Sequence, residues 1–453
     1  MKKVLAVILS LMMLLGMVNL AMAEDAKETY VNTGKLQYDP TAQVNNGEEM
    51  TLDFWVQVEV AETYQKWCDR YTALHPNIHF VLTPGSNEDH FKRLGMALAS
   101  GTGPQLFHMH NGLIDQFAAN LKPYDASVMP LDVLREDFNT VDDCLYNDQM
   151  YYMGLAVMSC GVFYNTQMWA DAGLTDTDIP TTWDDIAAVA KKLTQYDENG
   201  KITVAGFNYN EMSMEYLITA MNYDKGLAMF GEDGKSPVMN DEFKATVQWL
   251  KDLYEVENAG TAELPMSILS FSQSTSAMTY IGTWFGNWMK ANAPDLGYGF
   301  FMMPSVDGGT PAAYDRYNVE AAPAINGNVT DAEYAVINDY LCYLLSNDNF
   351  VLDFALMQYG TPTKKCLADN EQVQSDIVLG TVAKYMDRLI YPGAYPDSYS
   401  NALKKYFFDE VMLNHMDLDE AMAACEAEIV DALDSTDFMS VEKLYPHADE
   451  LKF

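Results

Sequence analysis

The chain has 453 residues, of which 65 are acidic and 27 are basic, so its formal net charge is −38 at neutral pH. A surface this acidic argues against a nucleic-acid partner, because lysine and arginine bind the phosphates, and against binding to anionic lipid. Hydrophobic residues make up 49% of the chain, which is enough for real cores, and at this length two domains are expected.

Residues 1–23 have the pattern of a secretory signal peptide. Two lysines precede the apolar run VLAVILSLMMLLGMV, and the tripeptide AMA forms an A-x-A cleavage site. The run is shorter than the ~20 apolar residues that a membrane-spanning helix needs. We therefore expect cleavage near Ala23 and export to a periplasm, the cell surface or the medium. No cysteine precedes Cys68, so no lipid-attachment (lipobox) cysteine is expected.

The folded part is expected to begin abruptly at Met50. The preceding residues 24–49 are polar and lack any helical or strand period, which predicts a flexible leader. After Met50 the residue pattern alternates between strand and helix. Strands are predicted over 51–59, 77–85 and 104–110, and helices over 61–74 and 87–101. This order predicts parallel crossover units and therefore an α/β fold.

Polar side chains stand where these predicted strands end. Gln57 and Glu59 lie at the end of the first strand, residues 85–90 form the turn after the second, and His110 and Asn111 end the third. In open α/β sheets ligands bind at the carboxyl ends of the strands. These positions are therefore candidate ligand contacts.

A second sheet is predicted further along the chain. The apolar run YYMGLAVMSCGVFY (residues 151–164) is typical of a strand buried on both faces. A short helix follows it, and Thr182 is placed to cap a helix over 183–193. We expect Trp169 and Trp183 to be core residues that pack these helices on the sheet, and not ligand contacts.

The segment IGTWFGNWMK (residues 281–290) follows a predicted strand and has the residue types of a ligand-binding loop. Its two glycines allow the backbone and an aromatic ring to approach a ligand closely. An indole can lie on the C–H face of a sugar, and an amide can bond two hydroxyl groups. Trp284 and Asn287 supply these groups, whereas Trp288 is either a further contact or a core residue.

Several segments together resemble extracellular solute-binding proteins. The first is LASGTGPQLFHMHNGLIDQFAANLKPYD, and the most diagnostic is CLYNDQMYYMGLAVMSCGVFYNTQMWADAGLTDTDIPTTWDDIAAVAKKLTQYDENGKITVAGF. MFGEDGKSPVMNDEFKATVQWLKDLYE, AMTYIGTWFGNWMK, LGYGFFMMPSVDGG, YGTPTKKCLAD and MDLDEAMAACEAEI follow in the family's order. The resemblance covers residues 50–435, and it is greatest to the sugar-binding branch that includes the maltose-type receptors of ABC importers.

The resemblance implies a two-lobed, periplasmic-binding-protein-like α/β fold. Each lobe would be a mixed sheet flanked by helices, and a multi-segment hinge would join the lobes. Lobe one is expected over 50–153 with 318–362, and lobe two over 154–317 with 363–453, with crossings near 153–157, 317–322 and 360–364.

The resemblance also implies a function without catalysis. Such proteins bind a mono- or oligosaccharide between the lobes and deliver it to ABC permease subunits, as monomers without a cofactor. The position that matches Trp284 commonly stacks on the ligand, and the region of Tyr399 contributes an aromatic ring. Several sugar receptors carry an acid on the connecting strand, whereas this chain has Met158 and Ser159 there. Ser159 is therefore a candidate contact, and maltose-like specificity is not expected.

Three alternatives remain open at this stage. A receptor for a cationic solute, such as a polyamine or basic peptide, is favoured by the acidic composition. A metal receptor could use His108 with His110, or His75 with His79, although Pro76 breaks the helical face of the second pair. A secreted carbohydrate-active enzyme would need two carboxylates at a fixed separation, which a sequence with 65 acids cannot identify. No metal site is predicted.

Two further patterns have structural explanations. QYDENGKITVAG resembles a calcium loop, but its alignment puts Gln195 and Gly206 at the strongest ligand positions, so a hairpin turn is predicted instead. The six cysteines include no CxxC pair. Cys68, Cys342 and Cys425 lie on apolar helical faces and are expected to be buried thiols.

Overall fold

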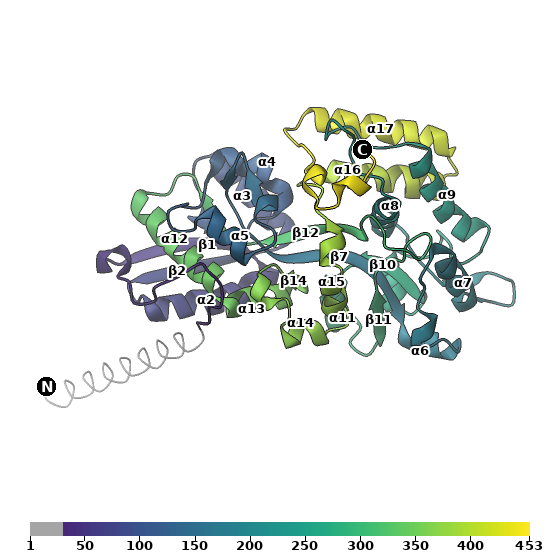
Figure 1. Ribbon diagram of the computed structural model, residues 1–453, viewed down its shortest axis with the longest axis horizontal. Helices are drawn as coiled ribbons and strands as arrows, with labels where there is room; N and C mark the ends of the chain where they lie inside the picture. Colours follow the sequence, from purple (N-terminus) through teal and green to yellow (C-terminus); the bar gives the residue numbers. More distant parts are fainter. Residues whose placement is uncertain (1–29) are drawn as a thin grey trace. The chain divides into compact units, whose positions relative to one another are not determined.

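The computed structural model describes residues 30–453, apart from the side chains of Asn87, Glu88, Asp115 and Ala321. The predicted signal peptide and residues 24–29 of the predicted leader lie outside the described residues. The chain divides into two compact units (Figure 1). Unit 1 comprises the chain up to Ala156 with Val319–Gln358 and Pro362–Asp369, and unit 2 comprises Val157–Asn318, Tyr359–Thr361 and Asn370–Phe453.

Unit 1 is built on a five-stranded mixed sheet. The strands follow the order β2 (Ile78–Gly85), β1 (Met50–Gln57), β3 (Leu106–Phe107), β13 (Ala324–Asn326) and β4 (Leu121–Lys122). β1 is parallel to both of its neighbours, whereas β13 is antiparallel to β3 and β4. The predicted crossover units are therefore confirmed. The third strand is shorter than predicted, because Asn111 begins a 3-10 turn (Asn111–Leu113) soon after it.

Helices cover both faces of this sheet. They are α2 (Ala61–Leu74), α3 (Asn87–Ala99), α4 (Ile114–Phe117), α5 (Leu131–Asp137), α12 (Asp331–Ser346) and α13 (Asp348–Gln358). The crossovers through α2 and α3 run in opposite directions along the sheet, so right-handed connections place them on opposite faces (Figure 1). In α2, Tyr64, Trp67, Cys68 and Tyr71 recur at helical spacing and are buried, which forms the stripe that packs on the core.

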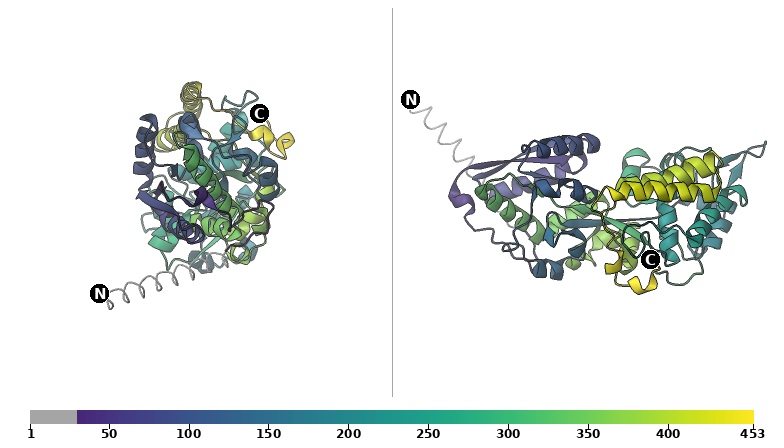
Figure 2. Two further views of the ribbon diagram at one scale, coloured as in Figure 1. Left: turned by 90° about the vertical axis from the view of Figure 1, so that its left-hand side faces the viewer. Right: turned by 90° about the horizontal axis from the view of Figure 1, so that it is seen from above.

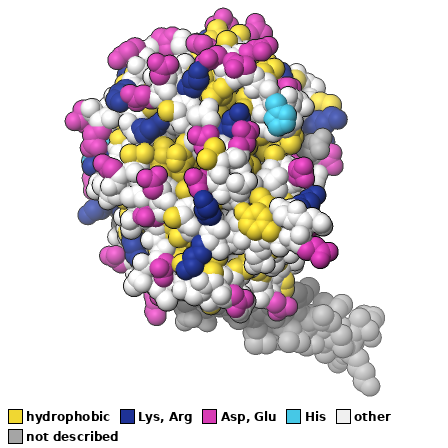
Figure 3. All heavy atoms as spheres, turned by 90° about the vertical axis from the view of Figure 1, so that its right-hand side faces the viewer, with side chains coloured by type: hydrophobic (Ala, Val, Ile, Leu, Met, Phe, Trp, Pro, Cys, Tyr) yellow, Lys and Arg dark blue, Asp and Glu magenta, His cyan; other side chains and the backbone are white. Residues whose placement is uncertain are grey.

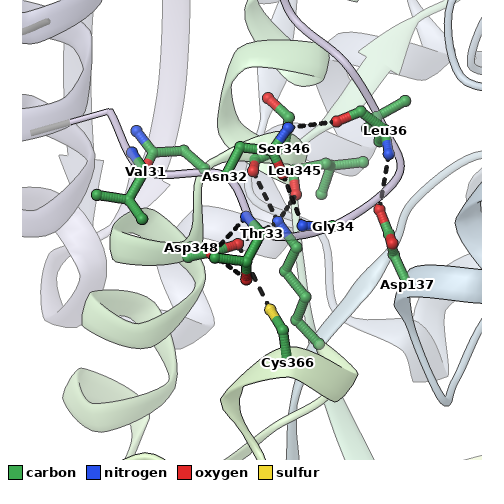
Figure 4. Close-up of polar contacts among 12 residues, drawn as sticks. Val31, Asn32, Thr33, Gly34, Leu36, Asp137, Leu345, Ser346, Asp348 and Cys366 are labelled. Atoms are coloured by element: carbon green, nitrogen blue, oxygen red, sulfur yellow. Dashed lines mark hydrogen bonds and ion pairs between the residues drawn. The ribbon is translucent and has the colours of Figure 1, made fainter.

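Residues 30–49 correct the prediction of a flexible leader, because they are bonded to unit 1 (Figure 4). We call residues 30–38 the N-terminal strap. The Asp348 amide donates to Val31 O (2.7 Å), and the Thr33 amide and hydroxyl donate to Asp348 Oδ2 (2.9 and 2.7 Å). Leu36 is buried, and its amide donates to Asp137 Oδ2 (2.8 Å). The partners of Thr33 and Leu36 are 315 and 101 residues away in the chain, so the local sequence pattern gives no indication of these contacts.

Unit 2 contains most of a second sheet, and three of its strands continue into unit 1. Its main path is β10 (Met278–Gly282), β7 (Gly154–Asn165), β12 (Asp315–Ala321) and β15 (Leu389–Ile390), and β11 (Tyr298–Phe301) and β14 (Thr361–Pro362) also pair with β7. β7 passes from unit 1 to unit 2 after Ala156, and β12 returns after Asn318. Almost every residue of β7 is buried, which confirms the buried connecting strand.

Most helices of the chain belong to unit 2. They are α6 (Thr166–Asp171), α7 (Trp183–Leu193), α8 (Met212–Asp224), α9 (Asp241–Glu255), α10 (Ser267–Ser272), α11 (Phe285–Asn292), α14 (Glu371–Ser375), α15 (Leu379–Lys384), α16 (Asp397–Leu403) and α17 (Leu418–Asp434), with the π-helix η9 (Lys404–Leu413). Figure 2 shows α17 running alongside the continuous helix formed by α16 and η9. None of the described helices is long and apolar enough to cross a membrane.

Several local predictions for unit 2 are confirmed. Thr182 and Asp185 form a reciprocal capping box at the start of α7. Trp169 and Trp183 are buried in the core of the unit. The predicted hairpin joins β8 (Gln195–Tyr196) to β9 (Ile202–Val204), and Asp197 accepts hydrogen bonds within its turn.

The cysteines and the surface also follow the sequence. The six cysteines are free thiols, and Cys68, Cys342 and Cys425 are buried as predicted. On the face in Figure 3, acidic side chains are spread among basic and apolar ones. On this face, therefore, no single kind of side chain forms a continuous patch.

Candidate functional site

The structure brings together the predicted contact residues of unit 1. β1 and β3 are adjacent and parallel, and the His108 amide extends their pairing by donating to Trp55 O (2.9 Å). Gln57, at the end of β1, is half-buried, and Glu59 is exposed in the turn that follows. The residues that follow β3 therefore lie beside the end of β1, as expected for parallel strands.

His110 and Asn111 occupy the turn after β3. Asn111 is buried, and the half-buried His110 accepts a hydrogen bond at Nδ1 from the Gly112 amide (3.2 Å). The backbone of His110 forms an isolated antiparallel bridge with Glu320 on β12. A third chain segment therefore reaches the same edge of unit 1.

Glu320 is a candidate site residue that the sequence reasoning missed. Its side chain is only 8% exposed. Burial raises the pKa of Glu320, and the charge of His110 lowers it in part. The available signal was the alternation of polar Arg316, Asn318 and Glu320 along β12, which places them on one face of a strand.

In unit 2, Ser159 lies within β7, beside the end of β10 and the start of β12. Its carbonyl accepts from the Thr283 amide after β10 (2.9 Å), and its hydroxyl donates to Arg316 O on β12 (3.0 Å). Ser159 is buried. Its hydroxyl is therefore used within unit 2, where it ties β7 to β12.

Trp284 follows β10 on this edge and is half-buried. A Cβ on Gly282 would lie 2.5 Å from Trp284 Nε1, so only glycine lets the indole lie against the strand end. The second glycine of the loop has another role, because a Cβ on Gly286 would lie 2.0 Å from the ring of Tyr359. Both glycines therefore allow close contacts within the protein, and the approach of a ligand to this loop remains a prediction.

The other predicted contact residues of unit 2, Asn287, Trp288 and Tyr399, differ in their surroundings. Asn287 and Trp288 lie in the first turns of α11 and are half-buried, and the Trp288 ring stacks on Phe285 with centroids 5.4 Å apart. Tyr399 is 3% exposed and belongs to the core of unit 2, where it packs on Phe230 (5.1 Å). Tyr399 therefore supports the unit from inside, whereas Tyr395 of the same segment is half-buried.

Arg316 is the centre of a charged and aromatic cluster that the sequence reasoning also missed. Its guanidinium pairs with Glu215 (Nη2 to Oε1, 3.2 Å) and lies over the rings of Tyr216 and Tyr395, 5.0 and 5.5 Å from their centroids. The side chain is 13% exposed, and its buried Nε has no hydrogen-bond partner among the described residues. Ser400 donates to the same Glu215 oxygen (2.8 Å).

The carboxylates of Asp315 and Glu215, beside Arg316, are buried away from water. Burial raises the pKa of Asp315 to about 6, and Arg316 and the hydroxyl of Tyr280 partly offset this. Burial likewise raises the pKa of Glu215, and Arg316 opposes the shift. The positive charge of Arg316 is therefore largely neutralised within unit 2, which suits contact with a neutral polar ligand better than capture of an anion.

The histidine pairs considered as metal ligands do not converge on a metal site. Among the described residues, no group of three His, Cys, Asp or Glu side chains could hold a metal ion. His75 Nε2 lies 2.5 Å from the Tyr38 hydroxyl, whereas His79 pairs with Glu49 (3.1 Å). These histidines have separate protein partners.

Comparisons with known proteins agree on one family. The family model for bacterial extracellular solute-binding proteins matches residues 57–337, which is more than half of the chain. No curated protein matches the chain.

Solved structures match over most of the chain. A solute-binding protein of an ABC transporter from Thermotoga lettingae, solved with α-D-tagatose, is 18% identical with a TM-score of 0.68. The maltose/maltodextrin-binding domain from Bdellovibrio bacteriovorus, solved with maltotriose, is 19% identical with a TM-score of 0.67. A cyclic α-maltosyl-1,6-maltose binding protein from Arthrobacter globiformis is 18% identical with a TM-score of 0.71. Each match covers 85% of this chain and 99% or more of the other, and this similarity confirms the predicted fold.

Proposed function

Because this chain belongs to the family of bacterial extracellular solute-binding proteins, we propose that it binds a mono- or oligosaccharide outside the cytoplasm and delivers it to an ABC transporter permease. The observation that carries this proposal is the similarity over 85% of the chain to structures solved with tagatose and maltotriose. The half-buried indole of Trp284, held by Gly282, supports it, because such a ring can stack on a sugar face.

The two units would act as the two lobes of the receptor. Unit 1 would contribute Gln57, Glu59, His110 and Asn111, and unit 2 would contribute Trp284, Asn287 and Trp288. Ser159 and Tyr399 would support the site from within unit 2, since both are buried there. A ligand that contacts both units stabilises a closed state by its greater affinity for that state, and the permease would recognise the closed form.

The family and the matched structures are binding proteins, and we propose that this chain likewise has no catalytic activity. It would act as a monomer without a cofactor. It would be exported after cleavage near Ala23 and work in a periplasm or at the cell surface.

A second candidate ligand is a cationic solute. The net charge of −38 and the buried carboxylate of Glu320 favour it. Binding of a polyamine would weaken steeply as the salt concentration rises, because exposed charges are screened within about 8 Å at physiological ionic strength. Binding of a neutral sugar would change little.

One titration series separates these candidates. The protein without its signal peptide is titrated calorimetrically with tagatose, maltotriose, mannobiose, mannotriose, spermidine and zinc at two salt concentrations. Salt-insensitive binding of a sugar, with no turnover of chromogenic glycosides, supports the proposal. Binding of spermidine alone supports the second candidate, and catalytic release of the chromophore contradicts both.

A further inference from the structure

Unit 1 contains a cavity of about 350 Å³ between the segment that precedes β1 and the helix α12. One wall is formed by residues 43–46, most of which belong to the 3-10 turn η1 (Val44–Gly47). The other wall is one face of α12, where Ala332, Ala335, Val336 and Asp339 recur at helical spacing. A cavity of this volume is large enough for a small organic molecule.

This cavity lies at the opposite end of β1 from the candidate sugar contacts of unit 1. The side chain of Asn77, directly before β2, donates to Val44 O and Glu48 O (3.1 and 2.9 Å). The turn η1 is therefore held where the parallel strands β1 and β2 begin. Gln57 lies at the other end of β1, and a strand of eight residues extends for roughly 23 Å.

Asp339 brings a carboxylate to the wall of the cavity. It is half-buried, and its Oδ1 accepts hydrogen bonds from the hydroxyls of Tyr38 and Tyr71 (3.2 and 2.6 Å). Burial raises the pKa of Asp339, and these two hydroxyls lower it in part. Neither hydroxyl carries a positive charge, and the charge of Asp39, which also acts on Asp339, is negative. A cation in the cavity would compensate the charge of the carboxylate.

The remaining lining suits an organic cation. Three of the residues 43–46 carry side-chain amides, whose oxygens can accept hydrogen bonds from an ammonium group. Ala332, Ala335 and Val336 add methyl groups, on which a short alkyl chain can lie. Within the described part of the chain, no group of three His, Cys, Asp or Glu side chains could hold a metal ion.

We propose that this cavity is a second ligand site, separate from the sugar site, for a short alkyl ammonium compound such as a diamine. The ammonium group pairs with Asp339, and the alkyl chain lies along α12. Tyr38, the last residue of the N-terminal strap, is bonded to the same carboxylate. A bound diamine therefore stabilises the attachment of the strap to unit 1, whether or not a sugar is bound.

Calorimetric titration of the full mature chain with putrescine, a four-carbon diamine, tests this site. Butane-1,4-diol is the matched neutral compound, because it has the same chain with hydroxyl groups in place of the ammonium groups. We expect putrescine to bind and to raise the Tm, and the diol to do neither. Absence of putrescine binding would overturn the inference, as would equal binding of the two compounds.

Four variants locate the bound putrescine. Asp339→Asn keeps an acceptor for both tyrosine hydroxyls but removes the charge, so the affinity should fall about 10- to 100-fold. Ala335→Leu puts a larger side chain on the cavity wall and should cause a similar loss, which decides the test if Asp339→Asn does not fold. Asp369→Asn, at an exposed acid of the same unit, and Trp284→Ala should each change the affinity less than twofold. Unchanged affinity in Ala335→Leu, or an equal loss in either control, would place putrescine elsewhere and overturn the inference.

Discussion

Lys364 Nζ lies 2.6 Å from Asp348 Oδ1 in unit 1, and the two side chains are 0% and 7% exposed. The ammonium also donates to the carbonyl oxygens of Leu345 and Ser346 (3.1 and 2.7 Å). The other carboxylate oxygen accepts two hydrogen bonds from Thr33. One buried ion pair therefore joins the N-terminal strap, the turn between α12 and α13, and the segment that follows β14.

Replacement of Asp348 by alanine should strongly destabilise unit 1. The Lys364 ammonium would stay buried without a countercharge, which typically costs about 3–5 kcal/mol. Urea unfolding followed by circular dichroism measures this loss. Asp369→Ala, which removes an exposed acid of the same unit, is the control and should change the free energy of unfolding by less than about 0.5 kcal/mol.

A double variant distinguishes the lost charge pair from general damage. Asp348→Leu with Lys364→Met removes both charges, so it should be clearly more stable than Asp348→Ala. A loss below about 1 kcal/mol for Asp348→Ala would contradict the role assigned to this pair.

The stability of the strap region should fall on acidification because of His75. Burial lowers the pKa of His75 from its ordinary 6.5 to about 4, and the charge of Asp39 offsets this in part. Between these pH values the unfolded chain binds a proton that the folded chain does not, so stability falls as pH drops from 6.5 to 4. The shift corresponds to roughly 3 kcal/mol.

The measurement is the difference in unfolding free energy between the unaltered protein and His75→Gln at several pH values. That difference should change by roughly 3 kcal/mol between pH 7 and pH 4. His79→Gln, at an exposed histidine of the same unit, is the control. A difference that stays constant with pH would show that His75 titrates normally.

Trp284→Ala should weaken sugar binding without unfolding unit 2. The indole is half-buried at the start of α11 and offers a ring face for stacking, and its removal should lower the affinity about 10-fold or more. Calorimetric titration with the bound sugar measures the loss. Tyr196→Ala, at an exposed ring on the β8–β9 hairpin, is the control. Unchanged affinity in Trp284→Ala would remove Trp284 from the site.

Arg316→Met should destabilise unit 2, because Glu215 would lose its buried countercharge. The expected loss is about 3–5 kcal/mol. Arg316→Lys should restore little of it, since an ammonium cannot lie flat on the rings of Tyr216 and Tyr395.

The combination of Arg316→Met with Glu215→Met provides the matched comparison. It should be more stable than Arg316→Met alone, because no unpaired charge remains. If both variants unfold at the same urea concentration, the Arg316–Glu215 pair does not couple.

Much of the fold could be predicted because its signals are local. The alternation of strand and helix patterns after Met50 was enough to predict the crossover units. Thr182 and Asp185 were enough to predict where a helix starts. Trp284 could be selected because glycines and aromatic residues cluster within ten residues.

The features that were missed depend on contacts between distant segments. The strap has no helical or strand period, and contacts with distant residues hold it, among them the hydrogen bonds from its amides to Asp137 and Asp348. Glu320 is one of 65 acids, and only the fold shows that it is buried. Tyr399 is also buried, although the sequence suggested a ligand contact. The local sequence around an aromatic residue does not distinguish a ring that faces solvent from one that packs in a core.

The position of β1 within its sheet determines where a recombinant clone of this protein can begin. The family match begins at Gln57, the last residue of β1, yet β1 lies between β2 and β3 and pairs with both. A clone trimmed to the matched range would leave the backbone groups of both neighbours without partners. It would also omit the strap. A clone that starts at or before Tyr30 keeps both β1 and the strap.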